Sequence, residues 1–220
     1  MIEAVIFDLD GTLLDRDSSL QSFVAVQYDR FAFLDRIKRQ DYIRRFIELD
    51  CHGHVWKDKV YQSLIEEFKI TQVNWQCLLD DYETEFINHC IPFPHLIKTL
   101  TLLKQNYLLG IITNGREVFQ SRSIKGLGIE DYLDTILISE TEQVRKPQPE
   151  IFHAALSKLK VMPEASVYVG DNPQADIIGA KNAGLQAIWK RNQFWSEPKE
   201  ADAIIDELNE ILPILDRWQK

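Results

Sequence analysis

The chain has 220 residues, of which 45% are hydrophobic and 27% charged, so it can bury a substantial core in one or two domains. Its formal net charge of -9 excludes an overall basic surface of the kind that binds a phosphate backbone, and we expect no nucleic-acid partner. The N-terminal stretch MIEAVIFDLDG carries an acid where a signal peptide carries basic residues. No apolar run approaches the roughly 18 residues that span a bilayer, so we expect no membrane partner.

The cysteines Cys51, Cys77 and Cys90 are odd in number, widely spaced and without a CxxC pair. This pattern argues against a disulfide framework and predicts reduced thiols. Together with the N-terminal and hydropathy patterns, it predicts a cytoplasmic protein.

The first predicted strand is EAVIFD at residues 3–8, a short β-branched and aromatic run typical of a strand buried on both faces. From about Asp15 to Cys90 no comparable run follows, and apolar residues recur at helical spacing instead. A break at Cys51–His54 fits a connection between two helices. Residues 16–91 are therefore predicted to form an all-helical domain.

After two prolines in IPFPHL at residues 91–96, strand and helix patterns alternate nearly to the end of the chain. The predicted strands are 108–113, 135–138, 166–171 and 186–190, and the predicted helices are 95–105, 117–125, 149–160, 173–183 and about 202–217. Pro149 and Pro173 suit the first turns of helices, and Asn106 and Gly184 suit helix ends.

Strands separated by helices imply right-handed crossovers and a parallel sheet covered by helices on both faces. The predicted fold class is therefore α/β, with a doubly wound, Rossmann-like parallel sheet as the core. We expect this core to comprise residues 1–15 and 92–220, and the smaller, all-helical domain to comprise residues 16–91.

Polar residues follow three of the predicted strands. Asp8 ends the first strand, Thr113 and Asn114 end the second, and Asp171 and Asn172 follow the fourth. Ligands of open parallel sheets bind beyond the carboxyl ends of the strands. The sequence therefore predicts one site at this edge.

Asp8 and Asp10 are the first candidates for chemistry at this edge. Side chains at positions i and i+2 of an extended segment point the same way, so these two would face a common space if the strand continued. Neighbouring carboxylates resist joint ionisation unless a cation lies between them or one holds a proton. Asp171 and Asp176 add oxygen donors of the kind that Mg²⁺ prefers. Taken alone, DLDGT also fits a strand that runs into a polar turn at Gly11.

Lys146, in VRKPQPEIF, offers a positive charge on a segment that Pro147 keeps extended. An ammonium group beside carboxylates stabilises them and can bind a phosphoryl group. Thr113 and Asn114 offer neutral hydrogen-bond donors. Taken alone, Lys146 would also fit a solvated lysine in a loop. Thr113 alone would fit a turn at the end of a strand.

Four segments in order resemble the motifs of the haloacid dehalogenase superfamily: FDLDGT at 7–12, ITNG at 112–115, KPQPEIF at 146–152 and VGDNPQADIIGAKNAG at 169–184. The helical insert resembles the cap of the phosphoglycolate-phosphatase-like branch, so the resemblance covers essentially the whole chain. The chain departs from the pattern at Gln143 and Asn106, where glycine is common. Asparagine tolerates the left-handed backbone that glycine adopts.

The resemblance implies that Asp8 is a nucleophile that attacks phosphorus and forms an aspartyl-phosphate. Asp10 would protonate the leaving alcohol and then activate water. The superfamily's dehalogenases lack an aspartate at this position because a halide leaves without a proton. Asp10 therefore favours phosphate ester chemistry.

The resemblance also implies that Mg²⁺ is held by Asp8, Asp171 and the Asp10 backbone carbonyl. Thr113, the Asn114 backbone amide and Lys146 would bind the phosphoryl oxygens, while Asp176 would orient Lys146 or a metal-bound water. Supporting positions are Gly11, Thr12, Asn172 and Asp176.

The leading hypothesis is a Mg²⁺-dependent phosphatase acting on a small phosphorylated metabolite. A sugar phosphomutase of the β-phosphoglucomutase type would use the same core. A third hypothesis is a non-catalytic protein that binds metal and phosphate and regulates a partner. The sequence leaves open the physiological substrate and the choice between monomer and homodimer.

Overall fold

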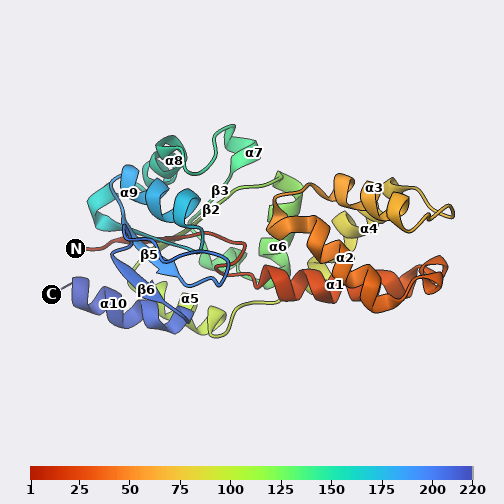
Figure 1. Cartoon of the computed structure of the whole chain (residues 1–220). Coiled ribbons are helices and arrows are strands. Elements are labelled where there is room, and N and C mark those ends of the chain that lie inside the picture. Colours follow the sequence, from red (N-terminus) through yellow and green to blue (C-terminus); the bar gives the residue numbers. More distant parts are fainter. Residues whose placement is uncertain (220) are drawn as a thin grey trace. The chain divides into compact units, whose positions relative to one another are not determined.

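The computed structural model describes residues 1–219, apart from the side chains of residues 32 and 33 (Figure 1). The chain divides into two compact units. One unit comprises Met1–Asp15 together with the chain from Pro92 onward, and the other comprises Arg16–Ile91. No helix in the described part of the chain is long and apolar enough to cross a bilayer.

A parallel sheet forms the centre of the first unit, as predicted. Within residues 1–219 it has six strands in the order β3-β2-β1-β4-β5-β6, and each neighbouring pair is parallel. The strands are β1 (Ala4–Phe7), β2 (Leu108–Thr113), β3 (Thr135–Ile138), β4 (Ser166–Gly170), β5 (Gln186–Lys190) and β6 (Ala203–Ile205). The central strands β1 and β4 are buried along their whole length, which explains their continuous apolar runs.

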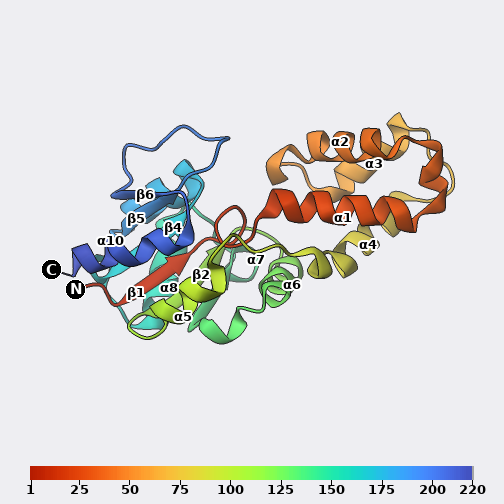
Figure 2. The ribbon, with the colours of Figure 1, turned by 90° about the horizontal axis from the view of Figure 1, so that it is seen from below.

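Helices cover both faces of this sheet, with α8 and α9 on one face and α5 and α10 on the other (Figures 1 and 2). The helices are α5 (Leu96–Leu103), α6 (Glu117–Leu127), α7 (Ser139–Glu142), α8 (Pro149–Leu159), α9 (Gly179–Asn182) and α10 (Ile211–Trp218). A π-helical turn, Pro173–Ile178, leads into α9, and 3-10 turns occur at Glu130–Tyr132, Pro163–Ala165 and Leu208–Glu210. The Phe152 ring of α8 packs edge-on against Tyr168 of β4, with ring centroids 5.1 Å apart.

Two details of the sequence prediction are wrong. The predicted helix from about 202 begins instead with strand β6, because Ala203, Ile204 and Ile205 pair with the outer edge of β5. The helix itself, α10, starts at Ile211. Asn106 does not take the left-handed conformation among the described residues, because α5 already ends at Leu103.

The second unit is all helical over its described residues. It comprises α1 (Arg16–Arg30), α2 (Arg39–Asp50), α3 (Lys57–Glu67) and α4 (Trp75–Glu85), with 3-10 turns at Ala32–Arg36, Cys51–Gly53 and Phe86–His89. Gln27 of α1 ties three of these helices together. Its Nε2 donates to the Leu78 carbonyl (3.0 Å) and to Asp81 Oδ2 (2.9 Å), and its Oε1 accepts from the Tyr61 hydroxyl (2.8 Å).

Substitutions at the buried tyrosines of this unit test how much the Gln27 hydrogen bonds contribute to the free energy of unfolding. Tyr61→Phe removes the donor to Gln27 and leaves a buried oxygen unpaired, so we expect a loss of about 1–2 kcal/mol in the free energy of unfolding. Urea denaturation at neutral pH measures it.

Tyr42 supplies the matched control, because its buried hydroxyl has no hydrogen-bond partner among the described residues. Removing an unpaired buried hydroxyl relieves a desolvation penalty, so Tyr42→Phe should leave stability unchanged or raise it. Equal losses for the two variants would show that the Gln27 network contributes nothing.

Candidate active site

The segment after β1 forms the centre of the site. The Asp8 backbone N–H donates to the Val169 carbonyl at 2.9 Å, which fixes Asp8 at the end of the sheet. Thr12 Oγ1 donates to Asp8 Oδ2 at 3.3 Å. Gly11 has a φ of +86°, and a Cβ at this position would lie 2.4 Å from Asp171 Oδ2. Only glycine therefore allows this turn to approach Asp171 so closely.

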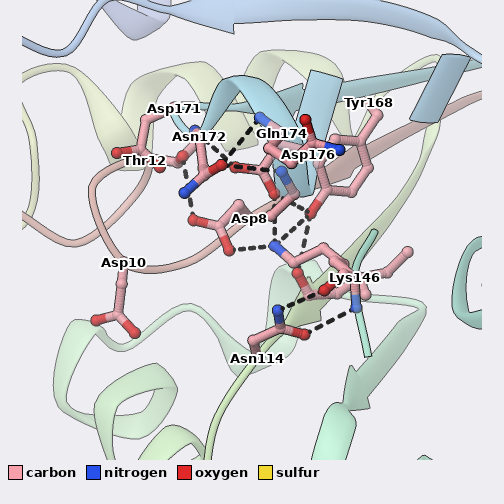
Figure 3. Close-up of polar contacts among 12 residues, drawn as sticks. Asp8, Asp10, Thr12, Asn114, Lys146, Tyr168, Asp171, Asn172, Gln174 and Asp176 are labelled. Atoms are coloured by element: carbon pink, nitrogen blue, oxygen red, sulfur yellow. Dashed lines mark hydrogen bonds and ion pairs between the residues drawn. The ribbon is translucent and has the colours of Figure 1, made fainter. Parts of the chain in front are cut away.

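Lys146 lies beside Asp8, with only 3% of its surface exposed. Its ammonium group contacts Asp8 Oδ1 at 2.5 Å, Asp176 Oδ1 at 2.7 Å and the Tyr168 hydroxyl at 2.8 Å (Figure 3). Tyr168 in turn donates to the Ile112 carbonyl at 3.0 Å. The three N–H donors of the lysine thus all have acceptors.

Asn114 holds the Lys146 segment in place through its side chain. Its Nδ2 donates to the Lys146 carbonyl and its Oδ1 accepts from the Lys146 backbone N–H, both at 3.0 Å. The end of β2 is thereby fastened to the loop that carries the lysine. Next to it, the buried Thr113 hydroxyl has no hydrogen-bond partner among residues 1–219. A buried hydroxyl without a partner is a donor available to a ligand.

Three buried carboxylates, Asp8, Asp171 and Asp176, each place an oxygen within 4.8 Å of the others. Burial, reinforced by the neighbouring acids, raises the pKa of Asp8 despite the contact with Lys146. Burial and the nearby Asp176 carboxylate raise the pKa of Asp171 to about 7. Burial alone would lower the pKa of Lys146, but Asp176 and Asp8 outweigh it and raise that pKa.

The charges of this group fit a divalent cation. Three ionised carboxylates outnumber the two buried ammonium groups near them, those of Lys146 and Lys190, and this excess of negative charge disfavours ionisation unless a cation compensates it. Oxygen donors from Asp8 and Asp171 are the ligand type that Mg²⁺ takes. Asp176 is already engaged, since its Oδ1 accepts from Lys146 and its Oδ2 accepts from the Asn172 backbone N–H at 2.9 Å. Asn172 also caps the following turn by accepting from Gln174 and Ala175.

Asp10 does not share the space of Asp8, because the strand does not continue as the common space would require. The strand ends at Phe7, and the chain turns at Gly11 instead of continuing extended. The Asp10 side chain points away from Asp8 and Lys146 (Figure 3). Its Oδ2 accepts instead from Gln120 Nε2 of α6 at 2.8 Å. Two carboxylates that would repel each other are thereby separated.

Sequence reasoning missed four residues of the site. They are Gln120, Tyr168, Lys190, whose Nζ is 3.3 Å from the Gly11 carbonyl, and Asn192, whose Nδ2 donates to Asp171 Oδ2 at 2.6 Å. Lys190 and Asn192 lie at the end of β5 and just beyond it, so the strand-end rule that found Asp8 and Asp171 would have found them. Gln120 and Tyr168 lie inside a helix and a strand, where spacing gives no signal.

Comparison with known proteins supports a single family. The family model described as haloacid dehalogenase-like hydrolase matches residues 5–190. A glyceraldehyde 3-phosphate phosphatase of Pyrococcus furiosus is 31% identical, with 98% of this chain and 94% of the relative covered.

Solved structures agree with this result. The structure of a HAD phosphatase from Thermococcus onnurineus superposes with a TM-score of 0.69 at 28% identity, over 97% of this chain and 98% of that one. A 2-haloacid dehalogenase from Pseudomonas syringae pv. Tomato DC3000 gives the same TM-score of 0.69 and the same 28% identity, over 99% and 100% of the two chains.

The raised pKa of Asp171 predicts how metal binding depends on pH. With a pKa of about 7, this carboxyl group is protonated in the folded protein when the pH lies below that value. A protonated carboxyl group is a poor metal ligand. Millimolar MgCl₂ should therefore raise the melting temperature at about pH 8 and have little effect at about pH 5. Asp171→Asn should lose the response, whereas Asp216→Asn, an exposed aspartate of α10, should keep it.

The raised pKa of Asp171 also determines how the free energy of unfolding depends on pH when no metal is present. Because the folded-state pKa of Asp171 lies above its ordinary value of 3.8, its contribution to the free energy of unfolding falls as pH rises between the two values. In EDTA, the free energy of unfolding of wild type and Asp171→Asn is measured at several pH values. As pH rises from about 5 to 8, the difference between the two should shift in favour of the variant by on the order of 2 kcal/mol. A constant difference between the two proteins would contradict the buried, proton-binding state of Asp171.

Proposed function

The chain belongs to the haloacid dehalogenase-like hydrolases, and we propose that it is a Mg²⁺-dependent phosphatase that hydrolyses monoesters of a small phosphorylated metabolite through an aspartyl-phosphate. The observation that carries the proposal is the buried group of Asp8, Lys146 and Asp171 at the end of the parallel sheet. This group supports the proposal because a buried carboxylate lies beside a fixed positive charge and near oxygen donors of the type that a divalent cation takes.

In the first half-reaction, an Asp8 carboxylate oxygen attacks the phosphorus of the ester. The bond between phosphorus and the alcohol oxygen breaks, and Asp10 gives its proton to that oxygen. In the second half-reaction, Asp10 takes a proton from water, whose oxygen attacks the same phosphorus. Asp8 leaves as a carboxylate, inorganic phosphate departs, and the enzyme returns to its starting state.

Lys146 and Thr113 stabilise the charge that moves during these steps. In the free protein Lys146 donates to Asp8, but phosphorylation removes the carboxylate charge and places negative charge on the phosphoryl oxygens. The ammonium group can then share its donor with a phosphoryl oxygen while its contacts with Asp176 and Tyr168 remain. The hydroxyl of Thr113, which has no hydrogen-bond partner in the described part of the chain, offers a second donor from the end of β2.

Asp8 and Asp171, with the Asp10 backbone carbonyl, would hold Mg²⁺. When bound, the ion would neutralise the carboxylates and the phosphoryl group and so allow their close approach. Thr12 and Gly11 support this arrangement, since the first holds Asp8 and the second lets the turn reach Asp171.

The choice between phosphatase and dehalogenase rests on Asp10. Both reactions use a carboxylate nucleophile, but only an alcohol leaving group needs a proton. The chain has an aspartate at this position, and the buried amide of Gln120 donates to it. The named relative at 31% identity is likewise a phosphatase, of glyceraldehyde 3-phosphate.

Hydrolysis of p-nitrophenyl phosphate with Mg²⁺ tests the proposal. Asp8→Asn should lower kcat by at least about 10³-fold, because the amide is not a nucleophile. Asp216→Asn makes the same chemical change on an exposed surface and should keep the wild-type rate. An Asp8→Asn protein that retains activity would rule out Asp8 as the nucleophile.

The same assay separates the alternatives. A wild-type protein that binds Mg²⁺ but hydrolyses no phosphate ester would favour the regulatory binding protein. Transfer of phosphate between positions of a hexose phosphate, dependent on a bisphosphate activator, would favour the mutase.

A further inference from the structure

Gln120 of α6 is a buried side chain that reaches the candidate acid. Only 4% of its surface is exposed. Its Nε2 donates to Asp10 Oδ2 at 2.8 Å and to the Asn114 carbonyl at 3.2 Å. One amide group therefore joins the turn after β1 to the turn after β2, two segments that lie far apart in the sequence.

The loop before α6 leaves room for this amide. A Cβ at Gly115 would lie 2.5 Å from Gln120 Nε2 and 2.9 Å from its Cγ, so the side chain occupies the space that any other residue at position 115 would need. The Gly115 backbone N–H is held separately by Ser139 Oγ at 3.0 Å. The loop thus packs closely around the amide, and Gln120 has little freedom to move.

Asp10 depends on such a contact for its orientation. It lies in a turn, beyond the last residue of β1, and its side chain points away from the Lys146 group (Figure 3). A proton donor contributes to catalysis only when its oxygen is held within hydrogen-bond reach of the leaving group. The Gln120 amide is a neutral donor that fixes one oxygen of the Asp10 carboxyl group, Oδ2.

We propose that Gln120 is a positioning residue for Asp10: its amide holds the carboxyl group in the orientation from which it protonates the leaving alcohol. This inference rests on the proposed function, because it concerns the acid of that reaction. Gln120 touches no reacting atom and acts only through Asp10. Its loss should therefore matter most for leaving groups that need a proton.

Leaving-group dependence tests this role in the full-length protein with Mg²⁺. Phenyl phosphate and p-nitrophenyl phosphate have similar size, but phenolate is the more basic leaving group and needs the proton more. Gln120→Met keeps the length of the side chain and removes both hydrogen bonds. We expect kcat/KM, which reports the first half-reaction, to fall about tenfold or more for phenyl phosphate and less than about threefold for p-nitrophenyl phosphate.

A control variant and a double variant separate positioning from a structural effect. Ser123→Ala lies one turn further along α6, where the buried hydroxyl donates to the Phe119 carbonyl at 3.1 Å, and it should change neither substrate. Asp10→Asn should show the same leaving-group dependence as Gln120→Met. Adding Gln120→Met to Asp10→Asn should then cause less than about a twofold further loss, because both act through one group.

The outcomes are distinct. Equal losses for the two esters, an additive loss in the double variant, or no loss in Gln120→Met would overturn the inference while the proposed function stands. A wild type that hydrolyses neither ester would overturn the proposed function and the inference with it. Should Gln120→Met not fold, Gln120→Glu keeps the shape but replaces the donor by an acceptor that repels Asp10, and it must give the same leaving-group dependence.

Discussion

The ion pairs of Lys146 are the interaction on which the rest of the site depends. Its ammonium group is buried between Asp8, Asp176 and the Tyr168 hydroxyl. Without it, Asp8 and Asp176 would lose their ion-pair partner and lie with Asp171 in a group of buried carboxylates within 4.8 Å of one another. With it, Asp8 is held as an oriented carboxylate, and Asp176 is fixed between the Lys146 ammonium group and the Asn172 backbone N–H. The remaining imbalance of charge is what a divalent ion would compensate.

The fold supplies this arrangement through backbone contacts at the ends of neighbouring strands. Asn114 binds both backbone polar groups of Lys146, so the loop that carries the lysine is fastened to β2. Glycines at positions 11 and 170 give the acids room, since a Cβ at Gly170 would lie 2.4 Å from the Cβ of Asp176. Close packing of small residues therefore matters as much as the charged groups, because it sets the distances between them.

Much of this could be predicted from the sequence, and the reasons differ between elements. Buried parallel strands are continuous apolar runs, so β2, β3 and β5 were located to the residue, and the polar residues after them indicated the edge of the sheet. Strand β6 was missed because Ile204 and Ile205 also fit the apolar spacing of the helix that follows. Its strand state depends on the free edge of β5, a tertiary contact.

In the candidate site, too, the sequence predicts some features, whereas others depend on tertiary packing. Asp8, Lys146, Asp171 and Asp176 lie together as their motifs suggested, but Asp10 does not share the space of Asp8. Side chains alternate along a strand only while the backbone stays extended, and β1 ends at Phe7, before both aspartates. The partners Tyr168 and Gln120 belong to regular elements, so only the packing of the sheet and α6 reveals their roles.

A crystal structure with Mg²⁺ and orthovanadate tests the central claim most directly. The account predicts an ion with oxygens of Asp8 and Asp171 at about 2.1 Å and vanadate facing Asp8, while Lys146 keeps its contact with Asp176. An ion bound elsewhere, with Lys146 turned away from Asp8 and Asp176, would contradict the claim that this buried lysine and one divalent ion together balance the acids.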